Sequence, residues 1–446
     1  MRYIPLTDAD QKAMLGAIEV QSIEELFASI PTSIRQSTRL SIPSTKTEFD
    51  LHVFFENLAK NNDGLSSKGW LSFLGAGAYE HFIPTVVDAL SSRGEFVTSY
   101  TPYQPEVSQG TLGAIFEFQS LIANLLGHDV ANASMYDGAS ATAEAVLMAL
   151  RIRARRRIYV SKGVHPEYLE VIRNYLRESD VEISELELDT SGRTIVPSLP
   201  KGEVIVVVSQ PNFFGVIEDL SPIAKAVHEG SGLLTVVTSQ AMAFGALKSP
   251  GSQDADIVAG EGQSLGNSLS FGGPYLGLMA SRMEYVRQLP GRLVGKTVDR
   301  GGREGYVLTL ATREQHIRRE KATSNICTNH SLCALRACIY LATLGERGLR
   351  DIAMKNIWAG NRLRKKLLEL KGVQPLYTGP IFNEFSVRLP ISTDAFLSRM
   401  EEERIFGGIS LSRWSLGGPN DLLIAVTETK NESDIDKYVT TARKIV

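Results

Sequence analysis

Short, continuous runs of Val, Ile, Leu and Ala recur through the middle of the chain, and stretches of helix length separate them. A strand that is apolar on both faces must be covered on both faces, and in a mostly parallel sheet the connecting helices supply that cover. The pattern therefore predicts a doubly wound α/β domain. The runs are IYV at 158–160, VIVVV at 204–208, LLTVV at 233–237, DIVAG at 256–260 and YLGLMAS at 275–281.

The two ends of the chain have a different pattern from the middle. Before position 69, helical pieces such as EFDLHVFFENLAK are split by a stretch rich in Pro and Ser, which predicts an N-terminal arm over 1–68. After position 345, helices alternate with strand-like segments, which predicts a compact α+β domain over 346–446. The large α/β domain then covers 69–345. This layout resembles that of the transferase-like fold type I pyridoxal phosphate (PLP) enzymes, although layout by itself does not establish a function.

The charge and hydropathy of the chain give no reason to expect a polyanionic partner or a membrane. The formal net charge is −3, so a nucleic acid or an anionic membrane would need a local basic patch. The densest patch, 151–157, follows a helical stretch, which favours a solvated helix end over a docking site for a partner. No run approaches the ~20 apolar residues that span a bilayer, and the N-terminus lacks the apolar core of a signal peptide. We expect a cytoplasmic protein.

The cysteines are too few and too closely spaced for a disulfide framework, which fits a reducing compartment. Cys327, His330 and Cys333 have helical spacing and apolar neighbours, and no second cluster supplies a fourth ligand. We expect small buried side chains there, and no metal site.

Four segments are richer in glycine, polar and aromatic residues than a plain scaffold requires. They are SFLGAGAYEHFIP at 72–84, a proline-broken loop at 99–120, the small-residue turn NASMYDGASATAEAV at 132–146, and 254–277, which contains GEGQSLG. Loop residues on a rigid scaffold are enriched in function only statistically, so ordinary core or packing roles stay open for each residue. The candidate residues of the first two segments are Tyr79, His81, Tyr100, Tyr103, Gln104, Glu106 and Gln109.

In this order and spacing, the four segments resemble the first subunit of the two-subunit glycine dehydrogenase (decarboxylating), in the P-protein family of the glycine cleavage system. The resemblance covers nearly the whole chain, and TPYQPEVSQG and GEGQSLG are specific strings. It implies that glycine is decarboxylated on PLP and that the aminomethyl group passes to the lipoyl arm of the H-protein. It also implies that the lysine that holds PLP belongs to a second subunit, the obligate partner of this chain in a heterodimer or heterotetramer.

The residue types in this chain also favour a cofactor lysine on the second subunit. A PLP enzyme of this fold needs a lysine in the loop after a strand, and an acid on an earlier strand end to keep the pyridine nitrogen protonated. Ser264 occupies roughly the lysine position, and the stretch 233–247 contains neither Asp nor Glu. Because a hydroxyl cannot form an imine, this chain should not hold PLP covalently. Lys248 is the only reserve candidate.

The turn from Asp137 to Ser140 has two possible roles. A small-residue turn that leads into a helix can bind phosphate through free backbone amides. Alternatively, Asp137 or Ser140 caps the helix by accepting hydrogen bonds from those amides. Since the lysine is missing, we favour the cap, and we interpret Asp137, Gly138 and Ser140 as a vestigial phosphate turn.

Three functions remain open from the sequence. The leading hypothesis is a subunit of the glycine-cleaving enzyme whose residues line the channel to the PLP of its partner, with Tyr103, Gln104 and His81 the first candidates. The second is a free-standing PLP enzyme, an aminotransferase or lyase that uses Lys248. The third is a structural or regulatory subunit that contributes no residue to an active site.

Overall fold

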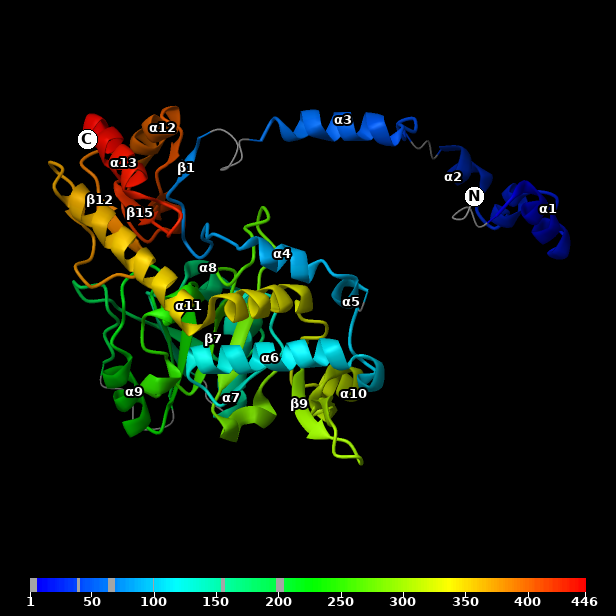
Figure 1. The fold of residues 1–446 in the computed structure, drawn as a ribbon, viewed down its shortest axis with the longest axis horizontal. Helices are drawn as coiled ribbons and strands as arrows, with labels where there is room; N and C mark the ends of the chain where they lie inside the picture. Colours follow the sequence, from blue (N-terminus) through cyan, green and yellow to red (C-terminus); the bar gives the residue numbers. More distant parts are fainter. Residues whose placement is uncertain (1–5, 38–40, 63–68, 99, 154–156, 198–203) are drawn as a thin grey trace. The chain divides into compact units, whose positions relative to one another are not determined.

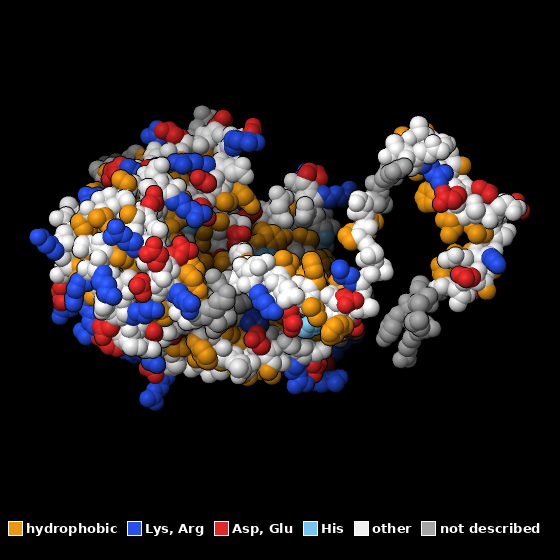
Figure 2. All heavy atoms as spheres, turned by 90° about the horizontal axis from the view of Figure 1, so that it is seen from above, with side chains coloured by type: hydrophobic (Ala, Val, Ile, Leu, Met, Phe, Trp, Pro, Cys, Tyr) orange, Lys and Arg blue, Asp and Glu red, His pale blue; other side chains and the backbone are white. Residues whose placement is uncertain are grey.

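The computed structural model describes residues 6–37, 41–62, 69–98, 100–153, 157–197 and 204–446. The chain forms two compact units, residues 1–64 and 65–446. In the first unit, the described helices are α1 (Asp8–Ala17), α2 (Thr32–Ser37) and α3 (Glu48–Ala59), with a 3-10 turn η1 (Ile23–Phe27). All residues of α3 are exposed, including Phe49, Phe54 and Phe55. Figure 2 shows apolar side chains gathered on the surface of this unit, so the unit has apolar surface to bury against a partner.

In the second unit, seven described strands form one sheet in the order β2-β8-β7-β6-β5-β3-β4. The pairs from β4 to β7 are parallel, and β8 joins β7 and β2 in antiparallel fashion. The predicted α/β class and its mostly parallel sheet are confirmed (Figure 1). The strands are β2 (Val130–Ala131), β3 (Arg157–Ser161), β4 (Glu182–Leu186), β5 (Ile205–Ser209), β6 (Leu233–Thr238), β7 (Ile257–Glu261) and β8 (Gly277–Ser281).

Helices cover both faces of this sheet because alternate strand residues point to opposite sides. Val206 and Val208 belong to the core that also includes apolar residues of α6 (Gln109–Leu126), α9 (Leu220–Glu229) and α11 (Ser331–Leu368). Ile205 and Val207 belong to the core on the other face, with α7 (Gly138–Ile152) and α8 (Pro166–Leu176). The helices α6 and α11 lie side by side (Figure 1). The core is therefore two layers separated by one sheet.

The C-terminal part has a second sheet, in the order β11-β12-β15-β14, packed with α12 (Thr393–Glu402) and α13 (Glu432–Ile445) around a core of its own. Its strands are β11 (Gln374–Pro375), β12 (Glu384–Arg388), β14 (Ile409–Ser410) and β15 (Asp421–Ala425). The helix α11 connects the two parts and is interrupted at Gly345, where φ is 61°. Gly345 is also the last residue of the predicted large domain, and the division of the chain into three domains stays a prediction.

The remaining described elements are short and lie around the two sheets. They are β1 (Leu71–Ser72), which pairs with β13 (Ile405–Phe406), the hairpin β9 (Leu293–Val298) and β10 (Glu304–Thr309), the helices α4 (Thr85–Ser91), α5 (Gly94–Val97) and α10 (Gln315–Arg318), and the 3-10 turns η2 (Pro105–Val107), η3 (Ala241–Gly245), η4 (Gly251–Gln253), η5 (Met283–Gln288), η6 (Ala311–Arg313), η7 (Arg319–Lys321) and η8 (Leu411–Trp414). Among the described residues, no helix is both long enough and apolar enough to cross a membrane. In the basic patch at 151–157, residues 154–156 lie outside the described residues.

The packing of α6 gives a direct test of the fold. Phe118 is 1% exposed in the core between α6 and the sheet. We expect Phe118→Ala to lower the free energy of unfolding by about 3–5 kcal/mol, because it removes a buried ring and leaves a cavity. Denaturant unfolding of the isolated chain measures this loss. The matched control Phe49→Ala on the exposed α3 should change stability by less than about 0.5 kcal/mol, and equal losses for both variants would contradict the described core.

Candidate functional site

The residue at the predicted lysine position lies in the loop that follows β7. Ser264 is buried, and its hydroxyl accepts a hydrogen bond from the backbone N–H of Met242 at 3.2 Å. Its side chain thus joins this loop to the turn after β6. The side chain of Lys248 is exposed, and Lys296 pairs with Glu304 at 2.6 Å on the hairpin. Neither lysine takes the position of Ser264.

The last residue of β7, Glu261, is buried and its carboxylate accepts three backbone N–H groups. Oε2 accepts from Gly138, and Oε1 accepts from Gln263 and Leu276, each at 2.9 Å. Burial raises the pKa of Glu261 to about 8, while the three donors favour its charged form. The carboxylate connects the N-terminus of α7, the loop after β7 and the approach to β8.

The turn before α7 is satisfied by its own side chains. The Asp137 carboxylate accepts from the N–H of Ser140 at 2.7 Å, and the Ser140 hydroxyl accepts from the N–H of Asp137 at 3.3 Å, a reciprocal helix cap. A Cβ atom added to Gly138 would clash with the Tyr168 hydroxyl and with Glu261. The turn and its surroundings are thus already filled by protein atoms.

These residues do not fit PLP. The cofactor needs an amine for its aldehyde, an acid for its pyridine nitrogen and free N–H groups for its phosphate. The lysine position holds Ser264, the residues at the end of β6 and in the following turn include no Asp or Glu, and the amide of Gly138 is already bonded to Glu261. In the described residues around this position, the amine and the acid are missing, and the first amide of α7 is already bonded.

The segment 72–84 lies against this filled position. The Tyr79 hydroxyl donates to Glu384 at 2.8 Å, and the N–H of Ala76 donates to the same carboxyl at 2.7 Å. The backbone of Tyr79 also exchanges two hydrogen bonds with the Gln263 side chain, at 3.1 and 3.2 Å. Burial raises the pKa of Glu384 to about 7, although these donors oppose the shift. Tyr79 is therefore a buried anchor of its segment.

His81 is also buried, in a polar cluster that joins the two parts of the second unit. Its Nδ1 lies 2.8 Å from the Glu428 carboxylate, and its Nε2 lies 3.0 Å from the Gln240 amide nitrogen. Asn356 of α11 donates to the same carboxylate at 2.9 Å. Burial would raise the pKa of Glu428, but His81 and the hydrogen bonds outweigh it and lower that pKa to about 2. This cluster fixes the segment 72–84 from the side of the C-terminal part.

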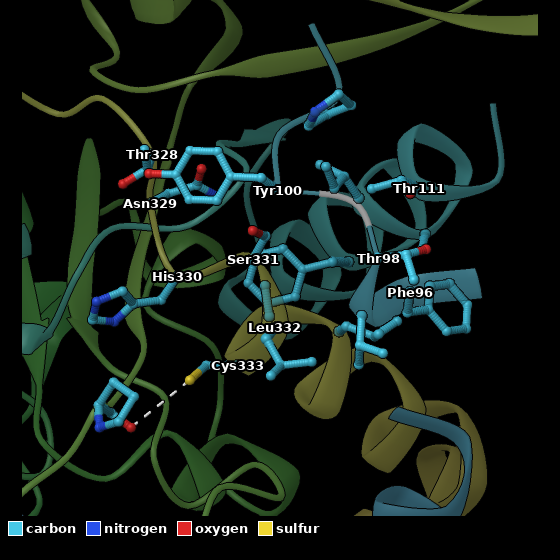
Figure 3. A pocket seen from close by; sticks show the side chains of 18 residues that line it. Phe96, Thr98, Tyr100, Thr111, Thr328, Asn329, His330, Ser331, Leu332 and Cys333 are labelled. Atoms are coloured by element: carbon cyan, nitrogen blue, oxygen red, sulfur yellow. Dashed lines mark hydrogen bonds between the residues drawn. The ribbon is translucent and has the colours of Figure 1, made fainter. Parts of the chain in front are cut away.

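A separate pocket of about 510 Å³ opens between α6, α5 and the N-terminus of α11. Its walls are mostly apolar, with a few hydroxyl and amide groups, the composition of a typical small-molecule site. Figure 3 shows the Tyr100 side chain on the same side of the cavity as Thr328 and Asn329. Asn329 and His330 are held in place, since Asn329 donates to Ala133 at 2.5 Å and His330 Nδ1 lies 2.8 Å from the carbonyl oxygen of Tyr275. The polar lining groups are Thr98, Tyr100, Thr111, Thr328, Asn329, His330 and Ser331.

The other predicted residues of the proline-broken loop lie near this pocket. The Tyr103 ring lies 5.2 Å from the Arg292 guanidinium, a cation–π contact, and Arg292 in turn reaches Asn329 at 3.4 Å. The Gln109 side chain accepts a hydrogen bond from the N–H of Tyr306 at 2.8 Å and donates one to its carbonyl oxygen at 2.9 Å. These two bonds hold the hairpin in place. Gln104 and Glu106 are exposed at the 3-10 turn η2.

The structure thus divides the predicted lining residues into two groups. Tyr79 and His81 are buried beside Gln263 and Gln240, whereas the five from Tyr100 to Gln109 lie in the exposed loop near the pocket. Sequence reasoning missed Glu261 and the pocket residues 328–331. The string GEGQSLG drew attention to the neighbourhood of Glu261, but its role depends on contacts with segments distant in sequence. His330 was considered only as a metal ligand.

The described residues contain no group of three or more His, Cys, Asp and Glu side chains that could hold a metal ion. The expectation of a buried side chain is wrong for Cys327, which is exposed because it lies before the start of α11, whereas Cys333 and Cys338 are buried free thiols. The Cys333 sulfur lies 3.8 Å from the carbonyl oxygen of Pro274 at the edge of the pocket (Figure 3).

Comparison with known proteins identifies the family. Residues 1–441 match the family "Glycine cleavage system P-protein". The chain belongs to the glycine cleavage system P-protein family. Proteins named "Probable glycine dehydrogenase (decarboxylating) subunit 1" are similar over their full lengths: that of Desulfotalea psychrophila is 45% identical, covering 100% of this chain and 99% of its own, and that of Moorella thermoacetica is 47% identical, covering 100% of both. The predicted resemblance to this P-protein subunit, an enzyme subunit, is therefore confirmed.

Solved structures support the fold of this P-protein chain. A crystal structure of glycine decarboxylase (P-protein) of the glycine cleavage system, in inhibitor-bound form, is 43% identical, with a TM-score of 0.91 and 100% coverage of both chains. Mouse CSAD in apo form is 14% identical, with a TM-score of 0.67 over 95% of this chain and 92% of its own, which shows a likeness of fold alone. The predicted fold type I PLP-enzyme class is confirmed. The family is associated with PLP, and the name "subunit 1" implies a subunit 2.

The buried Glu384 predicts a pH dependence of stability. Its pKa is raised from 4.5 to about 7 on folding, so the folded chain holds an extra proton between these values. The stabilising contribution is complete below pH 4.5 and is lost as the pH rises to about 7, with a total near 3 kcal/mol at ~1.4 kcal/mol per pKa unit. We expect Glu384→Gln, which imitates the protonated acid, to flatten this slope.

Denaturant unfolding at a series of pH values between 4.5 and 8 measures the effect. The control Glu402→Gln, at an exposed position on α12, should keep the wild-type slope. If Glu384→Gln has the same pH dependence as wild type, then this carboxyl is not the source of the slope.

Proposed function

We propose that this chain is the subunit of the glycine-cleaving enzyme that carries no cofactor. With a PLP-bearing subunit 2, it decarboxylates glycine and passes the aminomethyl group to the lipoyl arm of the H-protein. The observation that carries the proposal is the filled position at the end of β7, where Ser264 replaces an amine and Glu261 bonds the amide of Gly138. Because a P-protein requires PLP and this position cannot accept it, the cofactor belongs on the partner.

This chain contributes to catalysis by shaping the substrate channel and by orienting the substrate in it. The exposed loop with Tyr100, Tyr103, Gln104, Glu106 and Gln109 lines the channel by which glycine and the lipoyl arm reach the cofactor of the partner. The cation–π contact between Tyr103 and Arg292 and the anchoring of Gln109 on the hairpin hold this loop in one position. Positioning of this kind raises the rate because it holds the reactants in the right geometry, and it needs no new chemical group.

Tyr79 and His81 contribute to the same channel from the segment 72–84. Their side chains are held by Glu384 and Glu428, so the exposed part of the segment, including Phe82, keeps a fixed path. A rigid segment presents the same surface to glycine and to the partner in every turnover.

The first unit supports an obligate partner. The exposed apolar residues of α3 would be buried by packing against a partner. Obligate interfaces commonly bury about 2,000–5,000 Å² in total. Without such a surface, an amphipathic arm would expose apolar side chains to water at a cost of about 25 cal/mol per Å².

Two other functions are less well supported. A free-standing PLP enzyme would need Lys248, whose side chain is exposed in a turn, whereas the lysine position after β7 holds a buried serine. A purely structural or regulatory subunit would need no pocket with polar groups in its wall, yet Thr328, Asn329 and His330 line one.

Coexpression tests the proposal. The chain produced alone should be colourless and inert, and coexpression with a lysine-bearing subunit 2 should give glycine–bicarbonate exchange with PLP fixed by borohydride only on subunit 2. A yellow chain on which borohydride fixes PLP to Lys248 would refute the proposal and establish the free-standing enzyme.

Variants of the loop residues distinguish a role in catalysis from a purely structural role. In assembled complexes we expect Tyr103→Phe and Gln104→Ala to lower turnover several-fold while PLP content stays at the wild-type level, because both side chains act on substrate passage and neither touches the cofactor lysine. His81→Ala should do the same if complexes assemble normally. The measurement is the exchange rate together with bound PLP.

The matched control is Tyr175→Phe, which removes a hydroxyl from α8 on a different surface, and it should leave the rate unchanged. Wild-type rates for all three channel variants would show that the loop is scaffold and would favour a structural subunit.

A further inference from the structure

We propose that the Glu261 carboxyl group takes the place of a cofactor phosphate as the hydrogen-bond acceptor at the start of α7, so that a side chain of this chain fills the position where the fold family binds its cofactor. The proposal goes beyond the absence of a lysine. It assigns to one side chain the task of satisfying the amides that a phosphate would otherwise bind.

The hydrogen bonds of Glu261 are those of a bound anion. Its two oxygens accept N–H groups from Gly138, Gln263 and Leu276, which belong to a helix N-terminus and to two loop segments. A phosphate at a helix N-terminus is held by converging backbone N–H groups in the same way. In its ionised form the carboxyl group also supplies the negative charge that the positive end of the helix dipole favours.

The space around this carboxylate is filled as well. A side chain at Gly138 would clash with the Tyr168 hydroxyl, and the Tyr168 ring stacks on His165 at 4.8 Å. His165 Nε2 lies 2.9 Å from the carbonyl oxygen of Ala76, which brings the segment 72–84 against the same region. Aromatic rings and backbone therefore occupy the volume next to the Glu261 carboxyl group.

This arrangement explains why the position is stable without a ligand. If Glu261 were absent, three buried N–H groups would have no partner, and each unpaired buried donor is costly. The carboxylate removes that cost and also excludes a competing anion. Restoring the lysine alone therefore should not restore cofactor binding, because the phosphate would meet Glu261.

The first test is rescue by a free anion. In Glu261→Ala, inorganic phosphate should raise the thermal unfolding midpoint of the full-length chain in a concentration-dependent way at constant ionic strength, because it fills the vacated amides. Wild type should show no comparable shift. The matched control is Glu218→Ala, which removes another buried carboxylate, one bonded to Thr194 and Asn212 away from the α7 N-terminus, and phosphate should not rescue it. A phosphate response in Glu261→Ala no larger than in these two chains would overturn the proposal.

The second test compares cofactors and measures binding, so its readout differs from the thermal stability used in the first test. Ser264→Lys by itself should retain no PLP after desalting and borohydride treatment, and stable PLP on that variant would overturn the proposal. The double variant Ser264→Lys, Glu261→Ala should bind PLP at least ten-fold more tightly than the single variant. The same comparison with pyridoxal, which lacks the phosphate, should give no gain, and an equal gain for both would contradict a phosphate role. Both tests use this chain without subunit 2, so they are independent of glycine decarboxylation.

Discussion

The buried carboxylate of Glu261 is the interaction on which the middle of this structure depends. One side chain at the end of β7 bonds the first amide of α7, the loop that carries Ser264 and the residue before β8. Gly138 is separated from Glu261 by 123 positions in the sequence, so no local preference could bring the start of α7 to this carboxyl group. The N-terminus of α7 carries unpaired donors and a positive dipole end, and both require an anion or acceptor once they are buried. The loop geometry around the lysine position follows from meeting that requirement internally.

Two more buried carboxyl groups hold the segment 72–84 in place through hydrogen bonds. Glu384, on β12, accepts from Ala76 and Tyr79, and Glu428, after β15, accepts from the backbone of Phe82 and pairs with His81. Both acids come from the C-terminal part of the chain and hold a segment that also contacts Gln263 and Gln240 of the large sheet. A segment with glycines and little regular structure is thereby fixed, since the side chains of Tyr79 and His81 and the backbone N–H groups of Ala76 and Phe82 all have partners.

Much of the fold could be predicted from the sequence. Runs such as VIVVV specify strands buried on both faces, and the helices between them must cover those faces, so the α/β class and the mostly parallel sheet follow. Of the candidate site, the replacement of lysine by Ser264 and the absence of an acid after β6 were visible as residue types at expected positions. The two groups of candidate residues were not visible, because Tyr79 and Tyr103 are the same residue type in similar loops, and only one is buried.

The sequence by itself determined which residue types stand at the positions expected for a cofactor lysine and its acid, because a residue type at a position is a property of the sequence alone. It also determined the alternation of helices and strands, because hydrophobic periodicity is local. Only the tertiary structure decided that Glu261 bonds the N–H of Gly138, that the His81 side chain contacts Glu428 and Gln240, and that residues 328–331 meet Tyr100 at a pocket. Each of these depends on hydrogen bonds or packing between segments that are distant along the chain, and such contacts exist only after the sheet and its helices have set the distances between them.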